Sequence, residues 1–114
     1  MATTYKVLAQ AAPTTSRTGI AAASGDYVVP ASTSTVVSTI SITNTTSGAL
    51  SAYVYVTKSG GTSATTNAIV YGASVAANAV ATFTLGITLA TGDALVFGGS
   101  ATGLTIQAFG SEIA

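Results

Sequence analysis

Two stretches near the middle of the chain alternate between apolar side chains and hydroxyl or aromatic ones, and this alternation constrains the fold most. In residues 36–43 the apolar set is Val36, Ile40 and Ile42, and the hydroxyl set is Thr39, Ser41 and Thr43. In residues 52–57 the sequence Ala-Tyr-Val-Tyr-Val-Thr alternates in the same way. A period of two residues is typical of a strand that buries one face, so both stretches are predicted to be half-buried strands.

The segment between these two strands is built of turn-forming residues. It runs Asn44-Thr45-Thr46-Ser47-Gly48. Asparagine, serine and glycine favour tight turns because they bond to their own backbone or tolerate positive φ. A short polar connection between two alternating runs predicts an antiparallel hairpin, so we expect 36–43 to pair with 52–57.

Further short strands are expected along the rest of the chain, separated by turns that contain glycine, proline or asparagine. They are predicted at residues 5–10, 26–30, 68–71, 79–85, 94–97 and 104–109, with loops at 14–25 and 58–67. No segment has the apolar stripe of a packing helix, and 39 residues are valine, isoleucine or threonine, which favour strands. The fold predicted is all-β: a single-domain antiparallel β-sandwich or a jelly-roll-like barrel.

The length of 114 residues suits one domain with one core. Residues 1–25 are predicted to form an N-terminal strand followed by an arm or loop, and residues 26–114 the core of the sandwich. The pieces 3–12 and 14–25 are polar and weakly hydrophobic, so we expect them to contact neighbouring subunits.

Charge is scarce, and its scarcity excludes several classes of function. The chain has three basic and three acidic residues, no histidine and no cysteine, while 68 residues are alanine, glycine, serine or threonine. Three separated cations cannot form the basic patch that binds nucleic acid. Without histidine or cysteine there is no ordinary zinc, haem or iron–sulfur site, so no metal or other cofactor is expected.

The same scarcity argues against catalysis. A serine nucleophile would need Lys6 or Lys58 as its base, and Lys58 stands in a glycine-rich loop where a solvated lysine is expected. A glycosidase would need two of Asp26, Asp93 and Glu112. Both aspartates follow a glycine and precede an apolar run, which is typical of carboxylates that fix turns. The chain is therefore predicted not to be an enzyme.

A surface with almost no charge lacks the repulsion that keeps a protein solitary, so we expect this one to be shared with partners. Tyr53 and Tyr55 are expected side by side on the face opposite Val54, where they could pack in an interface or stack on a sugar. Interface packing is favoured because polar groups that orient sugars are scarce. With Tyr5 and Arg17 of the N-terminal piece, they are the candidate interface residues.

The sequence also bears on location. Serine, threonine or glycine interrupts every apolar run before it reaches 18 residues, so no membrane-spanning helix is predicted. The first six residues lack a basic segment followed by an apolar one, so no secretion signal is predicted. We expect the protein to act where it is made, or to leave the cell as part of a particle.

Four stretches of the chain resemble a family of small virion structural proteins of tailed bacteriophages, notably cyanobacterial and marine phages. They are MATTYKVLAQ at 1–10, YVVPA at 27–31 leading into the strand 36–42, LGITLATGD at 85–93, and AFGSE at 108–112. The resemblance implies a particle component without enzymatic activity or catalytic residues. One similar set of proteins consists of capsid cement proteins, small β-proteins that form trimers or dimers and clamp neighbouring major capsid subunits.

The leading hypothesis is therefore a capsid cement protein on the virion surface, present in the host cytoplasm before assembly. Its partners would be the major capsid protein and further copies of itself. The first rival is a tail, baseplate or fibre component that binds the host surface or a carbohydrate. The second is a carbohydrate-binding or adhesive domain of cellular origin.

Overall fold

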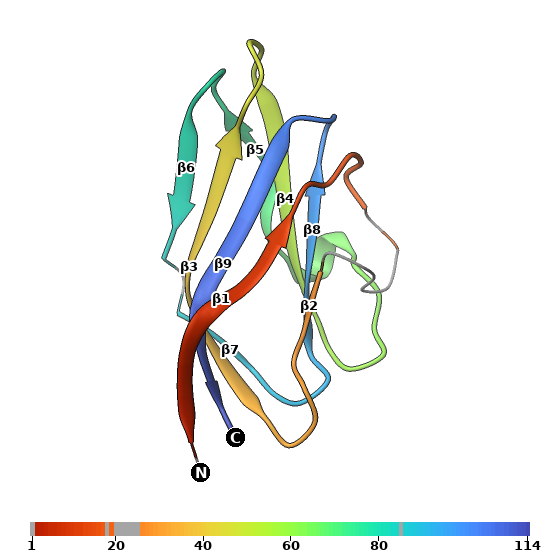
Figure 1. Ribbon diagram of the computed structural model, residues 1–114. Coiled ribbons are helices and arrows are strands. Elements are labelled where there is room, and N and C mark those ends of the chain that lie inside the picture. The colour runs from red at the N-terminus through yellow and green to blue at the C-terminus, as the bar shows by residue number, and fades with distance from the viewer. Residues whose placement is uncertain (1, 18, 20–25, 85) are drawn as a thin grey trace.

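A computed structural model describes residues 2–17, 19, 26–84 and 86–114, and its strands form two antiparallel sheets packed face to face (Figure 1). This confirms the predicted β-sandwich. One sheet has the order β1-β9-β3-β6, with β7 also pairing β3, and the other has the order β2-β8-β4-β5. The strands are β1 (Thr3–Ala11), β2 (Tyr27–Val28), β3 (Ser34–Asn44), β4 (Leu50–Thr57), β5 (Ala68–Val75), β6 (Val80–Phe83), β7 (Ile87–Leu89), β8 (Ala94–Gly99) and β9 (Leu104–Ile113), and a 3₁₀ turn, η1 (Thr65–Asn67), precedes β5.

The strand pairing follows the pattern of a jelly roll. When β6 and β7 are counted as two halves of one strand, the first strand pairs with the last, β1 with β9, and the second with the last but one, β2 with β8. Inside these, β3 pairs with β6 and β7, and β4 pairs with β5. A long antiparallel ribbon wrapped onto itself pairs its strands in this order. The sandwich and the jelly roll of the sequence analysis are thus one and the same fold.

The predicted hairpin between residues 36–43 and 52–57 is wrong, because the two strands lie in different sheets. Strand β3 pairs with β6, β7 and β9, whereas β4 pairs with β5 and β8. Asn44 holds the connection between them: its side-chain amide donates to the carbonyls of Gly48, at 2.8 Å, and Val75, at 3.0 Å. The polar segment turns the chain as expected, but it carries the chain across the sandwich.

One residue of the predicted inner face of β3 is also corrected. Ile40 and Ile42 are buried in the core as expected, but Val37 accompanies them, with 1% of its surface exposed, in place of Val36. Ser38 is an extra residue in the register between β3 and β9. A bulge of one residue exchanges the faces of the residues before it, so Val36 points outward.

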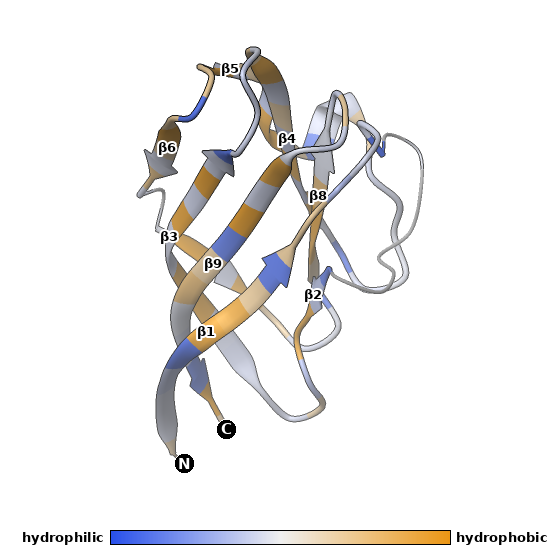
Figure 2. Ribbon diagram, turned by 45° about the horizontal axis from the view of Figure 1, so that its top comes forward, coloured by the Kyte–Doolittle hydropathy of each residue, from blue (hydrophilic) through white to orange (hydrophobic). Residues whose placement is uncertain are grey.

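The core lies between the sheets and is built from alternate residues of both, so that apolar and polar bands alternate along β3 and β9 (Figure 2). Burying these apolar side chains is the main stabilising contribution to such a fold. The buried core residues are Tyr27, Val29, Val37, Ile40, Ile42, Ala52, Val54, Val70, Val75, Leu89, Leu95, Phe97, Leu104, Ile106 and Ala108.

Near the end of the sandwich where the two termini lie, two hydrogen bonds and an ion pair link the two sheets. The Tyr27 hydroxyl, from the four-stranded sheet, lies 2.7 Å from the Thr35 hydroxyl and donates to Glu112 Oε2 at 2.5 Å. Lys6 Nζ lies 3.2 Å from the other oxygen of Glu112. The Tyr27 hydrogen bond, more than Lys6, holds the pKa of Glu112 below its ordinary value, against the opposing effect of burial. Burial, together with Glu112, raises the pKa of Tyr27 from 10.0 to about 12.

We expect the hydrogen bond between Tyr27 and Glu112 to make the stability of the fold fall at high pH. Because the pKa of Tyr27 is higher in the folded protein, its contribution is complete below pH 10.0 and is lost as the pH rises to about 12. Chemical unfolding between pH 8 and pH 12 should show a steeper loss of unfolding free energy in the natural protein than in Tyr27→Phe. Equal slopes in the two proteins would contradict the assignment.

Candidate functional surface

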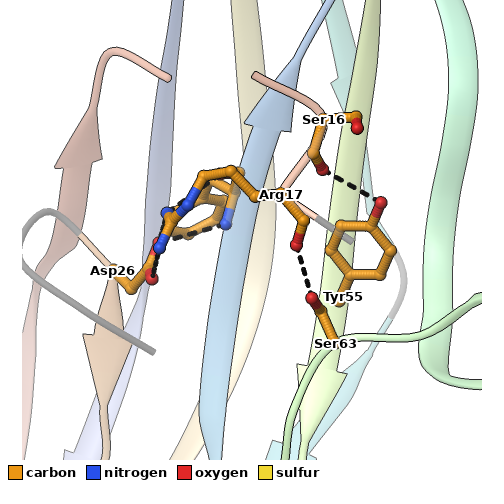
Figure 3. A network of polar contacts seen from close by, with 6 residues as sticks. Ser16, Arg17, Asp26, Tyr55 and Ser63 are labelled. Atoms are coloured by element: carbon orange, nitrogen blue, oxygen red, sulfur yellow. Dashed lines mark hydrogen bonds and ion pairs between the residues drawn. The ribbon is translucent and has the colours of Figure 1, made fainter. Parts of the chain in front are cut away.

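The four candidate interface residues lie on two opposite sides of the sandwich. Tyr5 lies on β1, at the margin of the five-stranded sheet, and is 84% exposed. Tyr53 and Tyr55 lie on the outer face of the four-stranded sheet, opposite the buried Val54 as predicted. Arg17 follows Ser16, whose carbonyl binds the Tyr55 hydroxyl, and its side chain points toward Asp26 (Figure 3). The structure therefore brings three of the four together and leaves Tyr5 apart.

The side chain of Arg17 makes an ion pair and hydrogen bonds within the chain. Its guanidinium binds both oxygens of Asp26, at 2.5 and 2.7 Å, and donates to the Phe97 carbonyl at 3.1 Å (Figure 3). Asp26 also accepts the backbone N–H of Phe97 at 3.2 Å. The Arg17 side chain is 14% exposed and that of Asp26 is fully buried. Since a bidentate arginine–carboxylate pair has fixed geometry, it holds Arg17 firmly beside β8.

The ion pair closes the edge of β8. Strand β2 pairs with β8 only as far as Leu95, and beyond it Arg17 and Asp26 bind the two backbone groups of Phe97 that a neighbouring strand would have bound. Further along, the Gly99 N–H donates to the Thr15 carbonyl at 2.8 Å. A side chain at Gly98 would meet the Ser16 carbonyl oxygen at 2.3 Å, so glycine at 98 lets the segment lie flat on the strand.

The tyrosines form a cluster of three, of which the sequence analysis found two. The ring of Tyr53 stacks on Tyr55 at 6.5 Å and meets the edge of Tyr71 at 5.2 Å. Tyr55 is completely buried, and its hydroxyl donates to the Ser16 carbonyl at 3.0 Å. Tyr71, on β5, is 58% exposed. The signal that could have found it is Gly72, whose φ of 70° marks a bulge that sets Tyr71 opposite Tyr53.

We expect Arg17→Met to destabilise the fold by about 3 kcal/mol, because it leaves the buried Asp26 carboxylate without its counter-charge. Hydrogen exchange of the Gly99 amide should accelerate, since its acceptor Thr15 lies in the released segment. The matched control is Lys58→Met in the exposed loop after β4, expected to change stability by less than about 0.5 kcal/mol. Equal denaturation midpoints for the two variants would contradict the role of Arg17.

The outer face of the five-stranded sheet carries a different kind of surface. In the part of the chain that the structure describes, its outward side chains include no lysine, arginine, aspartate or glutamate, and we call it the neutral face. The register shows which residues share it, because residues that are opposite each other on paired strands point to the same side. They are Thr3, Tyr5, Val7, Gln10, Ser34, Val36, Thr39, Ser41, Thr43, Val80, Thr82, Thr88, Thr105, Gln107, Phe109, Ser111 and Ile113.

The neutral face is mostly hydroxyl-bearing, with an apolar margin. Tyr5 and Val7 on β1 lie beside Phe109 and Val36, and a shallow open groove here is lined by Tyr5, Val36, Phe109 and Lys6 among others. Val7 is 47% exposed. A face of this kind can pack closely on another protein, since no charge has to lose its water when the two meet.

The charged side chains lie elsewhere, and five of the six have structural roles. Lys6 and Glu112 bind each other on the inner side of the five-stranded sheet, and Arg17 binds Asp26 on the opposite side of the sandwich. Asp93 accepts the backbone N–H groups of Ser59 and Ala90, fixing a turn as predicted. Among the described residues, no group of three or more acidic side chains could hold a metal ion. Nor does any helix in the described ranges have the length and apolar character to cross a membrane.

No protein-family model matches the chain, and no curated protein or solved structure matches it either. The fold class rests on the strand pairing, and the candidate function rests on the surfaces described above.

Proposed function

We propose that the chain is a non-enzymatic structural protein of a bacteriophage particle, and more specifically a capsid cement protein that binds the lattice of the major capsid protein. The observation that carries the proposal is the neutral face, a broad strand-built surface whose described side chains include no charged group. The resemblance of the chain to small phage virion proteins supports the choice of partner.

Two physical arguments connect this face with attachment to a shell. Burying a charged side chain costs several kcal/mol unless it is well paired, so a neutral face can bind with modest contacts. Many copies on a repeating lattice then turn weak individual contacts into strong collective attachment. Jelly rolls also occur in viral capsid domains, although a fold alone does not assign a function.

A lysine placed at the centre of the neutral face should weaken attachment. Ser41 lies there, opposite Gln107 on one side and Thr82 on the other. Ser41→Lys should lower binding to particles assembled without this protein by about tenfold or more, because its charge would lose water in the contact. Co-sedimentation of the purified protein with such particles measures the change.

The matched control is Ser74→Lys, the same substitution on an exposed position of β5 in the opposite sheet. It should bind particles as the natural protein does. Equal binding by Ser41→Lys and the natural protein would contradict attachment through the neutral face. Absence of binding by the natural protein would contradict the cement function itself.

A tail, baseplate or fibre component that binds a host surface or a carbohydrate is the second candidate. The exposed ring of Tyr71 beside Tyr53 favours it, because neighbouring aromatic rings can stack on a sugar. Jelly rolls also occur in lectin domains. Immunogold labelling of intact particles separates the two, with gold on the head for cement and on the tail for the rival.

A further inference from the structure

Strand β1 has one open edge, and its hydrogen-bonding groups can be assigned. Ala2 and Ala114 exchange both of their backbone hydrogen bonds, each at 2.9 Å. In an antiparallel pair such residues alternate with residues whose N–H and C=O point away from the partner. The unbroken register from Thr3 to Val7 therefore turns the backbone groups of Thr3, Tyr5 and Val7 away from β9. In the described part of the chain, β1 pairs with β9 alone.

The other sheet margins in the described ranges are short, bulged or covered. Strand β6 has four residues, and β5 is interrupted by two register shifts against β4. Strand β2 has two residues, and Arg17 and Asp26 cover β8 where β2 ends. Proteins commonly protect their sheet edges by such devices. In the described ranges the stretch from Thr3 to Val7 is neither bulged nor covered, because the bulge of β1 comes later, at Leu8. Its one charged side chain, Lys6, is of a type that protects sheet edges, but it is paired with Glu112.

A second observation falls on the same residues. Tyr5 and Val7 are the large apolar side chains of this stretch, and they are 84% and 47% exposed. The one charge in the stretch, that of Lys6, points to the other side of the sheet and is paired with Glu112. Two such edges would meet without like-charge repulsion, so the edge is electrostatically compatible with a copy of itself.

We propose that this edge binds the same edge of a second copy of the chain, in an antiparallel pair centred on Tyr5. In this register Tyr5 lies opposite its own counterpart, and Thr3 lies opposite Val7 of the second copy. Each of the three residues exchanges two backbone hydrogen bonds with the residue opposite. The two five-stranded sheets become one continuous sheet, and their neutral faces join on one side of the dimer.

The pairing is weak in solution, because an edge contact buries less surface than a standard stable interface. On a particle, two joined neutral faces bind together and so attach more strongly than one. The inference does not require the proposed function, since it concerns the isolated protein. Failure of dimerisation would leave the particle-binding experiment as it stands.

Sedimentation over a range of concentrations tests the pairing and its register. The natural protein should dimerise below about 1 mM. The double variant Thr3→Lys with Val7→Lys sets like charges opposite each other and should weaken the dimer by about tenfold or more. Thr3→Lys with Val7→Glu sets opposite charges there and should dimerise at least as well as the natural protein. Val80→Lys with Thr82→Lys, equal in net charge to the first variant but on β6, should leave the dimer unchanged.

Cross-linking gives an independent measurement. Directly opposed residues that share hydrogen bonds have Cα atoms about 5.5 Å apart, within the range that a disulfide spans. The natural chain has no cysteine, so Tyr5→Cys should form a disulfide-linked dimer on mild oxidation. Val80→Cys is the control, because Val80 is 58% exposed and lies on β6, at the other margin of the same sheet. It should stay monomeric.

Three results would overturn the proposal. They are a natural protein that is monomeric up to about 1 mM, equal dimerisation of the two Thr3 and Val7 double variants, and equal cross-linking of the two cysteine variants. Any of them would assign the open edge to an extended segment of another protein, or to no partner.

Discussion

The position of β9 between β1 and β3 is the constraint on which the rest of the structure depends. Its ten residues pair with the first strand on one side and with the long third strand on the other. Where β9 passes the bulge of β3, a side chain at Gly110 would lie 2.0 Å from the Val36 carbonyl oxygen, so only glycine allows this approach. Because β9 is shared in this way, β1 becomes the margin of the sheet and keeps one edge open.

Most of the few charges of the protein stabilise its interior and its ends, and none of the described ones lies on the neutral face. Arg17 and Asp26 do for β8 what a neighbouring strand would do, and Lys6 and Glu112 join β1 and β9 while Tyr27 links them to the second sheet. A near-zero net charge could have arisen from mixed charges over the whole surface. Here it coincides with a sheet face whose described side chains are all uncharged.

The sequence was sufficient to predict every strand except β7 (Ile87–Leu89), but not which strands pair with each other. Alternation in Ile40 and Ile42 and the turn at Asn44 are local signals, and both predictions are confirmed. Whether a strand continues in the same sheet or crosses to the other depends on contacts far apart in the chain, such as that of Asn44 with Val75. The extra residue Ser38 moves Val36 out of the core, and serine carries no distinctive signal for a bulge.

The candidate surfaces were predictable to a similar degree. The pairing of Tyr53 with Tyr55 opposite Val54 follows from a period of two and is confirmed. The burial of Tyr55 depends on a segment about forty residues earlier, held down by Arg17, which no local pattern could indicate. The open edge of β1 likewise becomes visible only when the order of the strands is known.

We propose that this protein covers a repeating lattice, and its copy number per particle tests that proposal most directly. The measurement is the molar ratio of this protein to the major capsid protein in purified particles, obtained from quantitative mass spectrometry. A cement protein should be present at about one copy per capsid subunit, because each lattice position offers the same contact. A few copies per particle would contradict the account and place the protein in the tail.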